Sequence, residues 1–140
     1  MSIPRRAHIL IEALMVLTVL AALLPVFYGW MIRELKANQQ LTLAQETDRQ
    51  IDFTQQYLQS VCSQSHTASV TSELMNIVTS KDSYEVGLRK DAVYVRRDAY
   101  RYLTTDPVKV TQLQFTILNE KLCLVTLQAN QKPYRFQLML

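Results

Sequence analysis

The chain has 140 residues, a formal net charge of +3, two cysteines and only two glycines. This length fits one compact domain, and so small a charge does not demand an anionic partner. The sequence contains no nucleophile motif, no phosphate-binding glycine loop and no metal-ligand spacing. We therefore expect no enzyme, no cofactor and no metal site.

The first predicted element is an apolar helix near the amino terminus. From Ala13 to Ile32 there are 20 residues without formal charge. As a helix they would span about 30 Å, the thickness of a bilayer core. Arg5 and Arg6 precede the run, and this short basic head favours a cytoplasmic amino terminus. Pro25 removes one helical hydrogen bond inside the run, so we expect a kink there.

Three simpler interpretations of the run are a cleaved signal peptide, a plain membrane anchor and a buried soluble helix. A signal peptide has a shorter apolar stretch followed by a small-x-small cleavage site, whereas this run is long and ends in PVFYGWMIRE. A domain of this size could not cover an apolar helix on all sides. Length alone leaves the plain anchor open.

Glu12 distinguishes the run from a plain anchor. A carboxylate in hydrocarbon is costly and marks a functional position by default. It can stay there only if it is protonated or paired with a cation. Neither lysine nor arginine lies within one helical turn of Glu12. The partner is therefore expected from another chain or from a newly made amino terminus.

The segment MSIPRRAHILIE resembles the processing signal of type IV pilins and pseudopilins. That signal is a short basic leader, a small residue at the cut, and an apolar helix with glutamate as its fifth residue. The resemblance implies a leader at residues 1–7, cleavage between Ala7 and His8 by a prepilin peptidase, and methylation of the new amine on His8. It also implies that Glu12 pairs with the terminal ammonium of a neighbouring subunit. Ala7 and His8 replace the Gly and Phe that are usual at these positions.

A long helix is expected to continue beyond the membrane. No proline or glycine interrupts the sequence from Trp30 to Val86, and its first part is rich in helix formers. Phe53, Tyr57 and Val61 are spaced by four and indicate a stripe that packs on a core. We predict a membrane and filament-core helix over residues 8–32, then a stalk and amphipathic helix over residues 33–62.

A polar break follows the helix. Ser63 to Ser72 is rich in serine and threonine, which is typical of a loop. His66 lies in this segment without an acidic residue or a second histidine close by. We therefore expect a solvated loop residue rather than a ligand or a catalytic base.

The remaining chain alternates apolar and polar residues as β-strands do. We predict strands over residues 73–79, 84–89, 92–97, 108–117, 121–128 and 134–140. Turns are expected at Lys90-Asp91, Asn119-Glu120 and Asn130-Gln131. The apolar pattern slips by one residue at Thr111-Gln112, which predicts a β-bulge. The strand KLCLVTLQ is apolar on both faces and is predicted to be central.

These elements predict an α+β fold in which one long amino-terminal helix is followed by an antiparallel β-meander, residues 63–140, packed on the helix's carboxyl-terminal half. Pilin-like proteins share this plan. With its short strands SYEVGLRK and AVYVRR and its proline-led strand DPVKVTQLQF, the whole chain is similar to competence minor pseudopilins of the ComGF type. The resemblance implies a minor pseudopilin that helps to assemble or prime a type IV pilus-like filament for DNA uptake and transformation.

The resemblance also implies partners and a location. The partners would be other major and minor pseudopilins, the prepilin peptidase and the membrane. The protein would be a single-pass membrane protein within a pseudopilus at the cell surface, with a cytoplasmic amino terminus and an extracytoplasmic carboxyl-terminal domain. Two alternatives stay open: a non-polymerising single-pass protein with an extracytoplasmic binding or scaffold domain, and a minor pseudopilin of a secretion system.

The two cysteines are candidates for a disulfide. A bond between Cys62 and Cys123 would pin helix to sheet and close a loop of about 60 residues, worth on the order of 4 kcal/mol in the entropy model. Two buried free thiols are the alternative, because geometry decides.

The densest basic stretch contains Arg89, Lys90, Arg96, Arg97 and Arg101. Successive strand residues point to opposite faces, so Arg96 and Arg97 cannot form one patch alone. A platform of aromatic and basic residues is not evident from the sequence. We expect a solvated or filament-contact face rather than a direct DNA contact.

Overall fold

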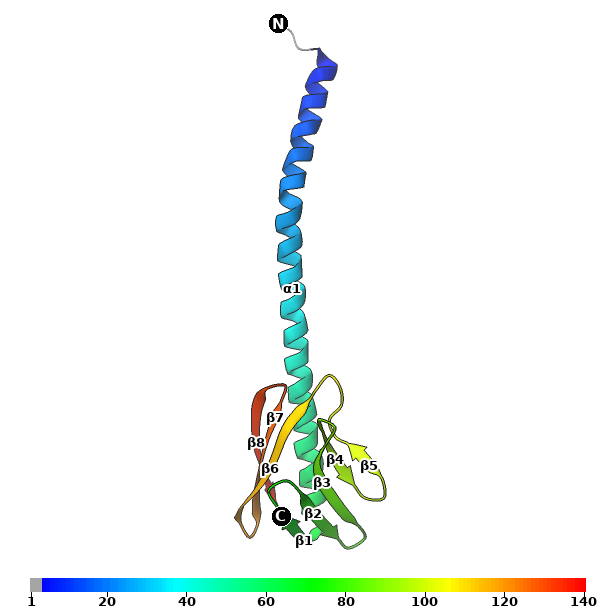
Figure 1. The fold of residues 1–140 in the computed structure, drawn as a ribbon, viewed down its shortest axis with the longest axis vertical. Coiled ribbons are helices and arrows are strands. Elements are labelled where there is room, and N and C mark those ends of the chain that lie inside the picture. Colours follow the sequence, from blue (N-terminus) through cyan, green and yellow to red (C-terminus); the bar gives the residue numbers. More distant parts are fainter. Residues whose placement is uncertain (1–3) are drawn as a thin grey trace. The chain divides into compact units, whose positions relative to one another are not determined.

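The structure, a computed structural model, describes residues 4–140. The chain divides into two compact units: unit 1, which ends at Thr42, and unit 2, Leu43–Leu140. One helix, α1 (Arg5–Ser63), contributes to both units, and all strands belong to unit 2 (Figure 1). The strands are β1 (Ser65–Val70), β2 (Met75–Thr79), β3 (Ser83–Arg89), β4 (Ala92–Arg96), β5 (Tyr100–Tyr102), β6 (Val110–Asn119), β7 (Leu122–Ala129) and β8 (Lys132–Met139). The predicted order of one long helix followed by antiparallel strands is confirmed.

Helix α1 is continuous over 59 residues and stays helical through Pro25. It ends at Ser63, where the sequence predicted a break. Three hydrogen bonds satisfy carbonyl groups of the last turn. Two come from serine hydroxyls: Ser63 Oγ donates to Ser60 O at 2.7 Å, and Ser65 Oγ donates to Cys62 O at 2.6 Å. The third comes from the main chain, where Gln64 N donates to Val61 O at 3.2 Å. These contacts replace the helical donors that are missing beyond the end of a helix.

The buried face of α1 differs from the predicted apolar stripe. Phe53 is 46% exposed, whereas Thr54 and Leu58 are almost completely buried. The buried residues of the helix are Thr47, Gln50, Ile51, Thr54, Leu58, Val61 and Cys62. Polar residues can occupy this face because their hydrogen bonds are made: the Thr54 hydroxyl donates to Gln50 O at 2.8 Å, and the Thr47 hydroxyl to Leu43 O at 2.7 Å.

The strands form two sheets rather than the single meander expected. One sheet has the order β1-β2-β3-β4-β5 and the other β6-β7-β8, all pairs antiparallel. The connection from β5 to β6 binds back to the start of β4 instead of forming a hairpin. Leu103 N donates to Val93 O at 2.7 Å, and Val110 N to Asp91 O at 2.8 Å. The chain therefore leaves the first sheet after β5, and β6 starts a second sheet.

The polar segment after the helix is a strand and not the loop that was expected. Strand β1 covers Ser65–Val70 and pairs with β2, and His66 lies at its register shift with an exposed side chain. Polar residues can occupy β1 because it is an edge strand whose side chains are half-buried or exposed. The short strand β5 is a second addition to the predicted set.

Two of the three predicted turns are confirmed in detail. Lys90 and Asp91 have φ of 51° and 57°, and Asn130 and Gln131 have φ of 50° and 66°, as two-residue hairpins with both central residues left-handed require. The third turn lies one residue later than predicted, at Glu120-Lys121. The bulge at Thr111-Gln112 is confirmed by the register shift between Val110 and Gln112.

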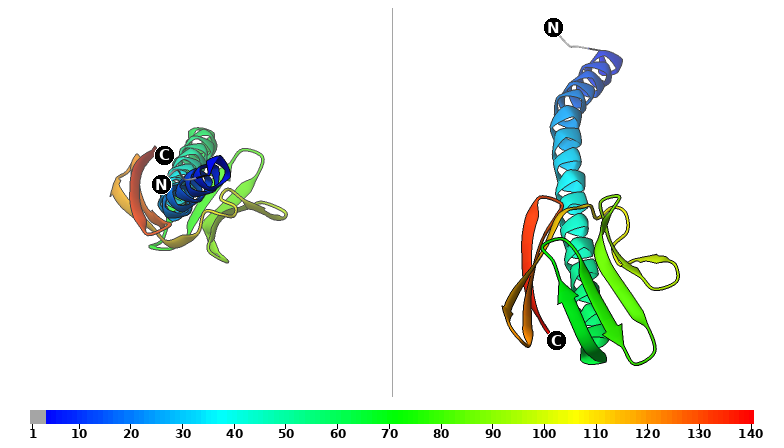
Figure 2. Two further views of the ribbon diagram at one scale, coloured as in Figure 1. Left: turned by 90° about the horizontal axis from the view of Figure 1, so that it is seen from above. Right: turned by 60° about the horizontal axis from the view of Figure 1, so that its bottom comes forward.

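The core of unit 2 lies between the two sheets and the carboxyl-terminal part of α1 (Figure 2). Every second residue of β7 is buried, namely Cys123, Val125, Leu127 and Ala129, and the residues between them are half-buried. Strand β7 is the middle strand of its sheet, so its predicted central position is confirmed.

Candidate functional site

The predicted cleavage junction lies at the start of α1. The Pro4 carbonyl accepts hydrogen bonds from Ala7 N at 2.8 Å and from His8 N at 3.1 Å, so the Ala7–His8 peptide belongs to the first turn. Of the predicted leader, residues 1–3 lie outside the described part of the chain. A first turn frays readily because its leading N–H groups lack helical acceptors. The junction is therefore in the part of the helix that unwinds most easily.

Glu12 lies one turn further along α1 with an exposed side chain. Among residues 4–140, Glu12 forms no salt bridge. His8 precedes it by four residues, which places both side chains on the same face of the helix. His8 is therefore a neighbour of Glu12 that the sequence interpretation overlooked, although the i, i+4 spacing is local.

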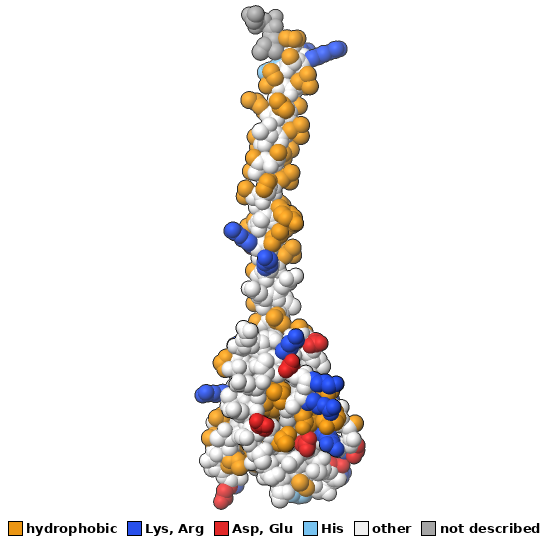
Figure 3. Space-filling model, viewed as in Figure 1, with side chains coloured by type: hydrophobic (Ala, Val, Ile, Leu, Met, Phe, Trp, Pro, Cys, Tyr) orange, Lys and Arg blue, Asp and Glu red, His pale blue; other side chains and the backbone are white. Residues whose placement is uncertain are grey.

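The helix around Glu12 is apolar on all sides. Its large apolar side chains from Ile9 to Met31 are between 41% and 70% exposed, and Figure 3 shows them along the amino-terminal part of α1. Within the described residues, this is the one helix long and apolar enough to cross a membrane. Such a surface requires lipid or other protein chains to cover it.

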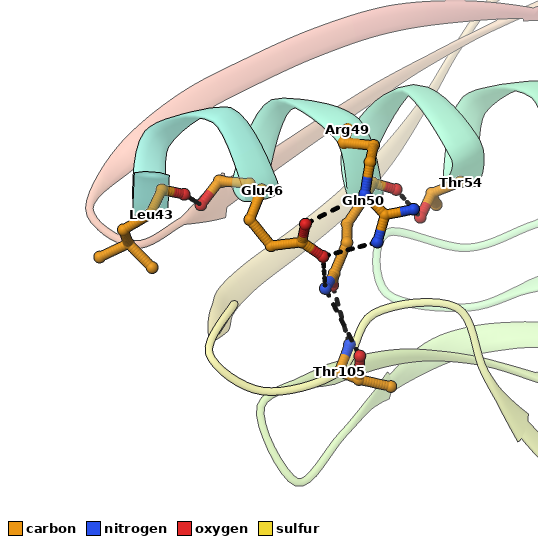
Figure 4. A network of polar contacts seen from close by, with 7 residues as sticks. Leu43, Glu46, Arg49, Gln50, Thr54 and Thr105 are labelled. Carbon is orange, nitrogen blue, oxygen red and sulfur yellow. Dashed lines mark hydrogen bonds and ion pairs between the residues drawn. The ribbon is translucent and has the colours of Figure 1, made fainter. Parts of the chain in front are cut away.

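In unit 2, a polar cluster fastens α1 to the β5–β6 connection (Figure 4). Gln50 Oε1 accepts from Thr105 N at 2.9 Å, and Gln50 Nε2 donates to Glu46 Oε1 at 2.8 Å. Arg49 donates to Glu46 from Nη2 at 2.7 Å and from Nε at 3.0 Å. Hydrogen bonds from Arg49 and then Gln50 lower the pKa of Glu46 to about 2. Glu46 therefore stays ionised and holds the Gln50 amide in the orientation that meets Thr105.

A second set of contacts fastens the same turns of α1 to the three-stranded sheet. Asn130 Nδ2 donates to Thr47 Oγ1 at 2.9 Å, and Asn130 Oδ1 accepts from Lys109 N at 3.0 Å. Tyr134 Oη donates to Asp48 Oδ1 at 2.6 Å, and this bond lowers the pKa of Asp48. Two turns of α1 thus hold the β5–β6 connection and the three-stranded sheet, which is a structural role.

The edge strand β8 is capped by a side chain of α1. Gln59 Oε1 accepts from Met139 N at 3.2 Å, and Gln59 Nε2 donates to Met139 O at 3.4 Å. The amide thus pairs with one residue of β8 as a neighbouring strand would. Such capping blocks strand addition at that position.

Cys62 and Cys123 are both buried in the core and are free thiols in the structure. Burial, and to a lesser extent the nearby Cys123, raises the pKa of Cys62 to about 11. Burial likewise raises the pKa of Cys123. The structure brings the two residues into one cluster, and a bond between them stays a prediction.

The four arginines of the basic stretch lie in three environments. Arg97 pairs with Asp82 at 3.0 Å, and the Arg101 guanidinium lies 5.3 Å from the centre of the Tyr57 ring. Arg89 and Arg96 both lie over the ring of Tyr100. The sequence interpretation did not find this combination of aromatic and basic residues, because it depends on the register of β3, β4 and β5.

Among residues 4–140, no group of three or more His, Cys, Asp or Glu residues is arranged to hold a metal ion. Comparison of the chain with models of protein families, with curated proteins and with solved structures gives no match. The interpretation of the amino-terminal segment therefore depends on its own residues and geometry.

Proposed function

We propose that this chain is a minor pseudopilin that helps to assemble or prime a type IV pilus-like filament for DNA uptake in a competent Gram-positive bacterium. The observation that carries the proposal is Glu12, an exposed carboxylate on an apolar helix of membrane-spanning length. It is the fifth residue after the Ala7–His8 junction.

The charge balance around Glu12 supports this proposal. The arginines nearest to Glu12 are Arg5 and Arg6, and both would leave with the leader. Cleavage would replace them with a terminal ammonium on His8. In a filament, that ammonium of one subunit would lie against Glu12 of the next, so both charges would be paired in a region without water.

The architecture of unit 2 is compatible with this use. The β5–β6 connection and the three-stranded sheet bind the carboxyl-terminal part of α1 through the Gln50, Asn130 and Gln59 contacts. A helix held at several points can carry a domain on the outside of a filament without depending on one contact. The same architecture suits a non-polymerising anchored protein, so the proposal depends on the processing of the amino terminus.

The test is the mass of the mature protein. The full chain is expressed in competent cells that contain a prepilin peptidase, extracted from membranes and measured intact and after digestion. We expect loss of residues 1–7 and one added methyl group on the His8 amine. An unprocessed terminus in those cells would overturn the proposal.

Two substitutions at the junction sharpen this test. Ala7→Gln places a long polar side chain at the cut, and we expect the precursor to accumulate. Ala7→Gly is the matched control and should be processed at least as completely as the parent chain. Equal processing of both variants would show that Ala7 is not at the cleaved bond.

A further inference from the structure

The outer face of β3, β4 and β5 carries a cluster of arginine and tyrosine side chains. Val86, Val93 and Val95 are at most 3% exposed and face the core, so the residues that alternate with them face outward. The pairing register sets Arg96 opposite Tyr100, and Tyr94 opposite Gly87 and Tyr102. We call Arg89, Tyr94, Arg96, Tyr100 and Tyr102 the Arg–Tyr face; basic side chains gather over this part of unit 2 in Figure 3.

The centre of the Arg–Tyr face is Tyr100. The Arg89 Cζ atom lies 4.1 Å and the Arg96 Cζ atom 5.4 Å from the centre of its ring. The Tyr94 ring meets it edge-on, with centroids 5.2 Å apart and an angle of 67° between the planes. Two guanidinium groups are therefore gathered on one aromatic ring, and their cation–π attraction to the ring offsets part of the repulsion between them.

Tyr94 is held in place from below and at its hydroxyl. A Cβ atom at Gly87 would lie 3.0 Å from the Tyr94 hydroxyl oxygen and 3.1 Å from a ring carbon, so the ring uses the space that glycine leaves. The Tyr94 hydroxyl donates to Glu85 Oε1 at 2.8 Å. Burial first, and then this bond, raise the pKa of Tyr94 to about 12. The Tyr94 ring, which packs against Tyr100, is thus fixed in position before any ligand binds.

The two arginines have unused binding capacity. Among residues 4–140, neither Arg89 nor Arg96 has a carboxylate within salt-bridge distance, and both side chains are exposed. The nearby acids are engaged elsewhere: Glu85 with Tyr94, and Asp82 with Arg97. A guanidinium stacked on a ring keeps its N–H edge available, and that edge matches a carboxylate with two parallel hydrogen bonds.

We propose that the Arg–Tyr face binds an acidic segment of a partner protein, whose carboxylates pair with Arg89 and Arg96 while its backbone and apolar atoms cover Tyr100 and Tyr102. Tyrosine and arginine are the residue types that dominate binding energy at protein interfaces. Tyr100 and Tyr102 are 43% and 38% exposed, so each still has surface to bury. Binding of this kind depends neither on Glu12 nor on processing at Ala7.

A nucleic acid fits this face less well. Single strands bind by stacking bases on open aromatic rings, but Arg89 and Arg96 already lie over the Tyr100 ring. An acidic peptide needs no open ring face, because its carboxylates approach the guanidinium edges.

The test uses the full chain in nanodiscs of phosphatidylcholine and a fluorescein-labelled octaglutamate peptide, with binding followed by fluorescence anisotropy. We expect binding that weakens with salt and falls by about tenfold or more in the Arg89→Gln/Arg96→Gln double variant. Octaglutamine should not bind. Arg135→Gln is the matched control, since Arg135 is an exposed arginine on β8, and it should leave the affinity within about twofold.

Two further variants test the role of the ring. Tyr100→Ala should weaken binding nearly as much as loss of the arginines, because the guanidinium groups lose their support. Tyr100→Phe keeps the ring and should bind as the parent chain does. Circular dichroism of each variant confirms that the fold is retained.

Three results would overturn the proposal. The first is equal binding of octaglutamate to the parent and to the double arginine variant. The second is a loss of binding in Arg135→Gln as large as in the double variant. A labelled thymidine dodecamer that binds more tightly than octaglutamate, with the same dependence on Arg89 and Arg96, would assign the face to nucleic acid instead.

Discussion

Gln50 and Thr105 lie 55 residues apart in the chain, and the Gln50 amide meets both the Thr105 backbone and its hydroxyl. Thr105 N donates to Gln50 Oε1 at 2.9 Å, and Gln50 Nε2 approaches Thr105 Oγ1 at 3.4 Å. Gln50 is only 6% exposed. One side chain of α1 thus satisfies a main-chain group in the segment where the chain leaves its first sheet.

Gln50→Ala should destabilise unit 2. The substitution removes the acceptor of Thr105 N, and water can take its place because Thr105 is exposed. We therefore expect the loss of one ordinary hydrogen bond, about 0.5–1.5 kcal/mol. The measurement is urea unfolding of the full chain in detergent, followed by tyrosine fluorescence and circular dichroism.

Gln55→Ala is the matched control for this prediction, because Gln55 is an exposed glutamine on the same helix. Its free energy of unfolding should stay within about 0.5 kcal/mol of the parent. Equal stability of the two variants would show that the Gln50–Thr105 bonds contribute nothing net.

Gly87→Ala should disturb the Tyr94 ring. The added methyl group would lie 2.7 Å from Leu74 Cδ2 and 3.0 Å from the Tyr94 oxygen. Leu74 can move, but the ring is held by Glu85, so we expect a loss of about 1–3 kcal/mol as for other overpacked sites. Thermal unfolding measures this loss. Gly29→Ala is the control, since a Cβ at Gly29 meets nothing within 4 Å.

The turns of unit 2 and the buried face of α1 show what the sequence could and could not predict. The turns at Lys90-Asp91 and Asn130-Gln131 and the bulge near Thr111 were predictable, because each depends on a few neighbouring residues. The buried face of α1 was not, because Thr47 and Gln50 are buried with hydrogen bonds to partners 83 and 55 residues away in the chain.

Neither the division into two sheets nor the Arg–Tyr face could be predicted from the sequence, for a related reason. The first depends on Leu103 and Val110 bonding to the start of β4, and the second on the register between β4 and β5. Neither pairing leaves a local signal. The junction at Ala7 and the carboxylate of Glu12 could be identified from the sequence, because their spacing is local; their roles stay predictions.

Cys62 and Cys123 should react with a thiol reagent only when the protein unfolds. Burial raises the pKa of Cys62 to about 11, so at pH 8 almost none of it is the reactive thiolate. Mass spectrometry after iodoacetamide treatment should show two added groups in urea and none in the native protein. No addition in urea without reductant, and two additions with it, would establish the disulfide instead.

The same thiols should make stability fall at alkaline pH. Burial raises the pKa of Cys62 from its ordinary value near 9.0 to about 11, so the folded state holds the thiol proton more tightly than the unfolded state. The stabilisation is complete below pH 9 and is lost as the pH rises toward 11. Cys62→Ser should reduce this slope in unfolding measured between those pH values, and an unchanged slope would contradict the assignment.

Glu12→Ala separates a filament subunit from a membrane anchor. The substitution removes a charge from an apolar helix, so membrane insertion should be at least as good as in the parent chain. If Glu12 pairs with the terminal ammonium of a neighbour, assembly should fail and transformation should fall by orders of magnitude. Protease accessibility of unit 2 measures export, cross-linking measures assembly, and uptake of a marker gene measures transformation. Exposed Glu34→Ala is the control on the same helix and should transform normally. Normal transformation with Glu12→Ala would favour the non-polymerising anchor, because an anchor has no use for a charge at this position.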